Sequence, residues 1–192
     1  MLRLAAAILA LALAACGVDK PQFNNTDITG AGYGKALQLA DPTGKLRTLA
    51  DFRGSVVLVF FGFTQCPDVC PTTLAEMKAV KELLGKDGKR FQVLFVTVDP
   101  ERDTPELLAQ YVSAFDPTFL GLRGDPEATA KVAKEFKIFY QKVPGNTPET
   151  YSVDHTAGSY IFDPQGRLRL YVRHGQSADK IAADIETLLA QG

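Results

Sequence analysis

The chain has 192 residues, which is enough for one domain of ordinary size and a tail. Hydrophobic residues make up 46% and charged residues 22%, which is normal for a soluble globular domain that needs no disulfide bonds to build a core. The net charge of −1 comes with no basic cluster, so the composition gives no support for nucleic-acid binding.

The N-terminus is typical of an exported lipoprotein. A basic start is followed by an apolar run at residues 4–15, too short to span a bilayer, which needs about 20 residues. The run ends in LAACG (13–17), which resembles a bacterial lipobox, in which the cysteine is acylated. We therefore expect residues 1–15 to be a signal peptide and Cys16 to carry the lipid. The alternative is a short buried helix that contains a cysteine.

Residues 17–34 are rich in glycine and asparagine, which is typical of a flexible tether. We therefore expect anchor and tether over 16–34, and one folded domain over 35–192. Hydrophobic periodicity and turn residues predict its elements. In chain order they are strands at 36–39 and 46–49, a buried strand at 56–63, a helix at 73–84, a buried strand at 91–98, a helix to about 115, a strand at 119–122, a helix to about 136, a loop at 143–150, a hairpin of 159–162 with 168–172, and a helix after Ser177.

Strands alternating with helices predict parallel βαβ units, and a hairpin with a last helix closes the domain. The class is thus α/β, and the order resembles a thioredoxin-like fold with an N-terminal strand extension and an inserted helix. The start of the first helix stays open. Thr73 fits a capping box, and Cys70 fits a cap with Pro71 at the first helical position.

Cys66 and Cys70 lie where a buried strand passes into a helix. The unpaired N–H groups and dipole of a helix N-terminus stabilise thiolates, so we expect a lowered thiol pKa. The C-x-x-x-C spacing is one residue longer than the usual redox C-x-x-C. Positions four apart share a helix face, which leaves room for a third metal ligand, and they also lie within disulfide range. Metal binding and redox chemistry therefore both stay open, beside a purely structural disulfide.

His155 is the candidate third ligand, because it precedes the strand at 159–162 in the segment that faces the cysteines in thioredoxins. Thiolates favour Cu(I), and an added imidazole allows Cu(II) as well. Asp154 or a backbone carbonyl is a candidate to orient the ring. The alternative is a hydrogen-bonded loop histidine. His174 is expected on the surface.

Three blocks in order resemble the Sco/SenC family: FTQCPDVCP (63–71), VTVDPERDTP (96–105) and YSVDHT (151–156). The resemblance covers about residues 36–190. It implies a thioredoxin fold, copper bound by Cys66, Cys70 and His155, and help in assembling the binuclear copper site of cytochrome c oxidase. Asp99 resembles a family residue near the metal, although turn chemistry at a strand end explains it equally well.

Two functions follow from this reading. The first is a metallochaperone without turnover, which delivers copper to the oxidase subunit that holds the copper site. The second is a thiol–disulfide oxidoreductase, with Cys66 and Cys70 as redox pair, that keeps the oxidase cysteines or copper donors reduced. A disulfide removes the thiolate ligands, so loading needs a reducing partner. A periplasmic copper donor is a further expected partner, and we expect a monomer.

A peroxiredoxin-type peroxidase is disfavoured by the residues around the cysteines. That class requires Pro seven and Thr three residues before its reactive Cys. The corresponding positions hold Val59 and Phe63 for Cys66, and Phe63 and Pro67 for Cys70.

Replacing the expected lipid-bearing residue tests the anchor. We expect the acyl chains to attach the protein to a bacterial membrane, with its domain in the periplasm or cell-envelope space. Cys16→Ser should therefore release the protein from the membrane or block its processing. Membrane fractionation and the mass of the mature chain measure this. Unaltered membrane association of the variant would mean that the lipobox reading is wrong.

Overall fold

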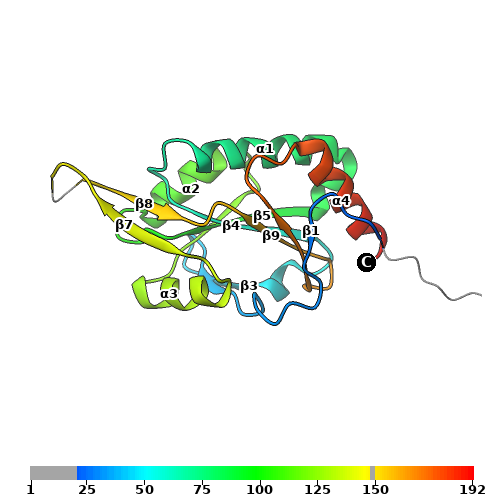
Figure 1. Ribbon diagram of the computed structural model, residues 1–192, viewed down its shortest axis with the longest axis horizontal. Helices are drawn as coiled ribbons and strands as arrows, with labels where there is room; N and C mark the ends of the chain where they lie inside the picture. The colour runs from blue at the N-terminus through cyan, green and yellow to red at the C-terminus, as the bar shows by residue number, and fades with distance from the viewer. Residues whose placement is uncertain (1–20, 148–149) are drawn as a thin grey trace, which may run out of the picture.

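A six-stranded sheet forms the centre of the computed structural model, which describes residues 21–147 and 150–192 (Figure 1). Its strands in spatial order are β1 (Thr26–Asp27), β10 (Leu168–Val172), β9 (Ser159–Phe162), β4 (Val56–Gly62), β5 (Phe91–Thr97) and β6 (Leu120–Leu122). Two hairpins lie outside it: β2 (Gln38–Ala40) with β3 (Leu46–Thr48), and β7 (Tyr140–Pro144) with β8 (Tyr151–His155). The helices are α1 (Val69–Leu83), α2 (Pro105–Ser113), α3 (Pro126–Glu135) and α4 (Ala178–Ala190), with 3-10 turns η1 (Leu49–Phe52) and η2 (Gly85–Arg90).

The central strand β4 is buried at all seven positions and pairs in parallel with β5 and antiparallel with β9. Its alternate residues face two cores. Phe60 packs in the core formed with α1, α2 and α4, and Phe61 packs in the core formed with α3 and the N-terminal segment. A strand covered on both faces needs an unbroken apolar run. The expected thioredoxin-like α/β fold is confirmed.

Helix α1 begins at Val69, so both expected starts are wrong. Pro71 lies in the first turn, where a missing N–H costs nothing because the first N–H groups have no partner within the helix. Asp68 precedes the helix, and its carbonyl accepts a hydrogen bond from the Thr72 N–H at 3.1 Å. Cys70 is therefore in the first helical turn, and Cys66 is in the loop before it.

The strands of the hairpin β7–β8 flank the expected loop at 143–150, and of the described residues in that range only 143 and 144 belong to a strand. Pro144 pairs with Tyr151 and Tyr140 pairs with His155, so the connection spans only 145–150. Four of the five β7 residues are exposed, which hides the strand from a search for apolar patterns. The hairpin projects from the body at the end opposite to α4 (Figure 1). His155 is the last residue of β8 and pairs with Tyr140, the first residue of β7, so it lies at the base of the hairpin.

The N-terminal segment differs from the expected tether. Thr26 and Asp27 of β1 pair with β10, and the Gly34 N–H donates to the Glu135 carbonyl at 3.0 Å. Asparagine and glycine suggested flexibility, but here they supply hydrogen bonds and turns. Residues 1–20, with the expected signal peptide, Cys16 and the start of the tether, lie outside the described part of the chain. Within that part, no helix has the length and apolarity to cross a membrane.

Asp184 fastens this segment and gives a stability prediction. Its carboxylate is 1% exposed and accepts four hydrogen bonds from the backbone and side-chain nitrogens of Asn24 and Asn25, at 2.8–3.0 Å. Asp184→Asn replaces one acceptor oxygen with an NH₂ group, which faces the Asn24 or Asn25 donors and cannot accept from them. The free energy of unfolding, measured by urea denaturation, should therefore fall by about 2 kcal/mol. The exposed Glu186→Gln on the same helix is the control, and an equal effect of both variants would contradict this role.

Candidate metal centre

Three side chains converge where β4 ends. The ligand atoms of Cys66, Cys70 and His155 all lie within 4.8 Å of one another, and Cys70 Sγ is 3.6 Å from His155 Nε2. Among the described residues this is the one group of three histidine, cysteine or acidic side chains so arranged. Both cysteines are free thiols, Cys70 buried and Cys66 partly exposed. Two sulfurs and one imidazole nitrogen form a donor set for a soft metal ion.

Gly62 allows the Cys70 sulfur to pack directly on the central strand. A Cβ atom at position 62 would lie 2.6 Å from Cys70 Sγ and 2.9 Å from the Phe95 ring, closer than real contacts allow. Glycine is therefore required at the end of β4. The sequence carries a signal for this role, because a glycine within an apolar strand often marks a close approach.

Burial sets the pKa of Cys70. The side chain is 0% exposed, and this desolvation, with the neighbouring Cys66 thiol, raises the pKa of Cys70 well above its usual value. The expectation of a lowered pKa is therefore wrong for this residue, because desolvation outweighs the helix N-terminus. The first turn of the helix donates a hydrogen bond to the other sulfur: the Cys70 N–H lies 3.4 Å from Cys66 Sγ.

The tautomer of His155 follows from its backbone contact. Nδ1 lies 3.1 Å from the Thr156 carbonyl, which can only accept, so Nδ1 carries the proton and the Nε2 lone pair faces Cys70. Burial lowers the pKa of His155, so the ring is neutral near pH 7. The ring also meets Phe60 and Phe63 edge-on, with centroids 6.1 and 5.9 Å away. It is thus held in the form that binds a metal.

Asp154 does not orient this ring. It lies on the opposite, exposed face of β8, because successive side chains of a strand alternate. Of the two candidates, the structure provides the backbone carbonyl, that of Thr156. Asp154 acts only through its charge, which opposes the lowering of the pKa of His155.

Asp99 is not one of the three grouped ligand residues, and it contacts β8, the strand that carries His155. It is 1% exposed, accepts a hydrogen bond from the Tyr151 hydroxyl at 2.8 Å, and forms an ion pair with Arg102. Arg102 belongs to the block VTVDPERDTP, but its spacing along the chain does not predict a role for it. Its Nη1 also donates to the Tyr151 carbonyl at 2.8 Å. Asp99 thus acts on the metal centre through β8.

Asp103 ties the cysteine loop to β5 and was also missed. Its buried carboxylate accepts hydrogen bonds from the Thr64 hydroxyl at 2.6 Å, the Thr64 N–H at 3.1 Å and the Thr97 hydroxyl at 2.5 Å. Burial raises the pKa of Asp103. A buried carboxylate with this many donors fixes the loop in one conformation.

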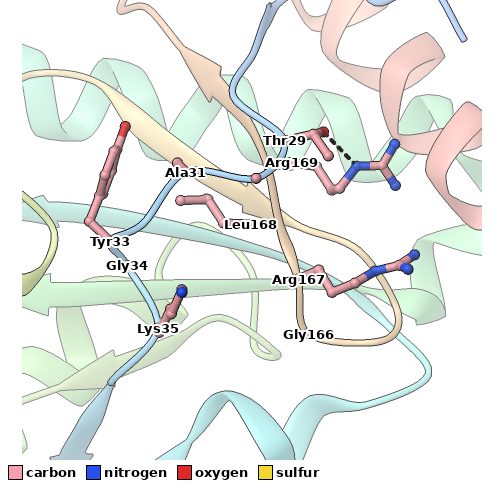
Figure 2. A pocket seen from close by; sticks show the side chains of 10 residues that line it. Thr29, Ala31, Tyr33, Gly34, Lys35, Gly166, Arg167, Leu168 and Arg169 are labelled. Carbon is pink, nitrogen blue, oxygen red and sulfur yellow. Dashed lines mark hydrogen bonds between the residues drawn. The ribbon is translucent and has the colours of Figure 1, made fainter. Parts of the chain in front are cut away.

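A cavity lies apart from the metal centre. Its volume is about 650 Å³, and it is formed by residues 29–35 and 166–169. Figure 2 shows Lys35, Leu168 and Arg167 around it, with Arg169 hydrogen-bonded to Thr29. It contains none of the three ligand residues, so cavity size does not locate the metal centre here.

Comparison with known proteins identifies relatives along most of the chain. The SCO1/SenC family model matches residues 25–190. The mitochondrial SCO2 homolog of Bos taurus is 40% identical over 156 residues, which are 80% of this chain and 59% of that protein. This chain thus spans about three fifths of the length of that relative.

Two solved structures are similar over nearly their whole length. Copper-bound ScoI of Bradyrhizobium japonicum is 40% identical, with a TM-score of 0.74 over 81% of this chain and 99% of that one. Apo Sco1 of Thermus thermophilus is 43% identical, with a TM-score of 0.76 over 87% and 97%.

The different burial of the two thiols predicts selective alkylation. Iodoacetamide at pH 8 should modify Cys66 before Cys70, because only thiolates react and Cys70 is buried with a raised pKa. We expect at least about a tenfold difference in rate, the change in thiolate fraction for one pKa unit. Peptide mapping by mass spectrometry measures it. Urea-unfolded protein, where both should react alike, is the control, and equal rates in the folded chain would contradict the prediction.

Proposed function

Because the chain belongs to the SCO1/SenC family, we propose that it binds one copper ion through Cys66, Cys70 and His155. We further propose that it delivers copper to the binuclear copper site of cytochrome c oxidase during assembly of that enzyme. The observation that carries the proposal is the convergence of two free thiols and a neutral imidazole within 4.8 Å. A relative 40% identical to this chain has copper bound.

The donor set favours Cu(I), since soft thiolates prefer this ion, and the imidazole extends the site to Cu(II). Binding requires deprotonation of the cysteines and therefore releases protons. The raised pKa of Cys70 makes its proton a direct competitor of the metal. Copper binding therefore weakens as the pH falls.

Transfer to a partner requires an accessible side of the site. Cys66 is partly exposed and precedes a loop of exposed residues, whereas Cys70 is fully buried. An incoming thiolate of the oxidase subunit would thus replace Cys66 first and Cys70 last. We propose that the domain works in the periplasm or cell-envelope space and is anchored to the membrane through Cys16. A copper donor would load the site, and a thiol reductant would keep Cys66 and Cys70 reduced.

A second candidate function is thiol–disulfide exchange. The observation that favours it is the proximity of the two free sulfurs, with Cys66 Sγ hydrogen-bonded to the Cys70 N–H at 3.4 Å. The dithiol would form a disulfide and pass two electrons and two protons to a disulfide of the substrate, which becomes a dithiol. That substrate would be the oxidase cysteines or those of the copper donor.

Anaerobic Cu(I) titration of the reduced protein, with a competing chelator, tests the first proposal. Wild type should bind one copper per chain. His155→Ala should bind at least about 10- to 100-fold more weakly, since losing even a hydrogen-bond partner of a metal ligand costs that much. His174→Ala is the matched control, because His174 is exposed and outside the ligand group.

The same proteins separate the two functions. Unchanged copper affinity of His155→Ala, combined with rapid catalytic reduction of a disulfide substrate by wild type, would refute the copper carrier and favour the oxidoreductase. One copper per chain, weakened in His155→Ala and without disulfide turnover, would support the carrier.

A further inference from the structure

The strand that carries His155 has little support of its own. It belongs to the two-stranded hairpin β7–β8, which shares no ladder with the six-stranded sheet. A two-stranded hairpin is marginally stable in water. Within β8 only Val153 is fully buried, at 4% exposed. Contacts from outside the hairpin must therefore fix His155 relative to the thiols.

Arg102 provides such contacts from the β5–α2 loop. Its guanidinium carbon lies 3.6 Å from the centre of the Tyr151 ring, and Nη1 donates to the Tyr151 carbonyl at 2.8 Å. Nη1 also lies 3.1 Å from Oε1 of Gln65, the residue before Cys66. Nε forms an ion pair with Asp99, and the Asp99 carboxylate accepts a hydrogen bond from the Tyr151 hydroxyl. One side chain thus joins the cysteine loop to the first residue of β8.

We propose that Arg102 is a positioning residue that holds β8 against the cysteine loop and so sets where His155 meets the two sulfurs. This inference rests on the proposed copper function. Arg102 touches none of the three ligand atoms and acts through Tyr151, Gln65 and Asp99.

The geometry of β8 transmits the constraint. Tyr151, Val153 and His155 are two residues apart and share the inward face of the strand. Phe63 gives a second connection: its ring centre is 5.7 Å from the Arg102 guanidinium carbon and 5.9 Å from the centre of the His155 ring. Arg102 thus contacts Tyr151, at one end of the inward face, directly, and it is connected to His155, at the other end, through Phe63.

Stability alone does not explain arginine at this position. Its Nη2 is buried and has no hydrogen-bond partner among the described residues, which costs free energy. Lysine would keep the charge without this unpaired group, but it lacks the planar fork that stacks on one residue while it bonds others. Arg102→Lys therefore removes the positioning and retains the charge.

The first measurement uses hydrogen exchange in the reduced, metal-free protein. Arg102→Lys should speed the exchange of hairpin amides by about tenfold, with β4 and β5 unchanged. A suitable probe is Asp154, whose pair with Gln141 is a hydrogen-bonded position of the ladder. Arg53→Lys is the matched control, since Arg53 is exposed and its side chain forms no hydrogen bond or ion pair with the described residues. Tyr151→Phe, which keeps the ring and loses only the bond to Asp99, is a milder second variant with a smaller change in the same direction.

The second measurement is a double-mutant cycle on Cu(I) affinity. Arg102→Lys should weaken binding about tenfold when His155 is present and not at all in a His155→Ala background. Equal losses in both backgrounds, or unchanged hairpin exchange in both Arg102→Lys and Tyr151→Phe, would overturn the proposal. Absence of copper binding by wild type would refute the proposed function instead, and the hydrogen-exchange result would still decide whether Arg102 holds the hairpin.

Discussion

The contact between the Cys70 sulfur and Gly62 is the constraint on which the site depends. Gly62 ends the central strand, whose seven residues are all buried, and Cys70 lies in the first turn of the helix packed on that strand. Because even a methyl group at position 62 would collide with the sulfur, helix and strand meet at one fixed distance. One ligand is therefore as rigid as the core itself. The same burial raises the pKa of the Cys70 thiol, so the rigid position of this sulfur and its raised pKa have one cause.

The other two ligands come from less buried parts of the chain and depend on polar contacts. Asp103 fixes the loop before Cys66 through Thr64, and Arg102 fixes the strand before His155 through Tyr151. The site thus combines one ligand set by apolar packing with two set by hydrogen bonds. Such a division fits the proposed delivery of copper, because the two partly exposed ligands can leave while the buried one stays.

The elements that the sequence predicted well were those with strong apolar patterns. The runs at 56–63 and 91–98 became β4 and β5, and Asp125 caps α3 as expected of an acidic residue before Pro126. The hairpin β7–β8 was missed because its residues are mostly exposed, and exposed strands have no apolar signature. The convergence of Cys66, Cys70 and His155 was anticipated from motifs. The roles of Gly62, Arg102 and Asp103 were not, because they depend on distances between segments that spacing along the chain does not reveal.

The docked N-terminal segment has a consequence for the reach of the domain. Phe23 already packs on the core, with the Arg169 guanidinium 5.6 Å from its ring. If Cys16 carries the expected lipid, seven residue steps remain, and these span at most about 25 Å. The segment enters the fold beside α4, at the end opposite to the β7–β8 hairpin (Figure 1). In an anchored molecule this connection would keep the N-terminal end of the domain within about 25 Å of the lipid surface, with the β7–β8 hairpin at the other end of the molecule.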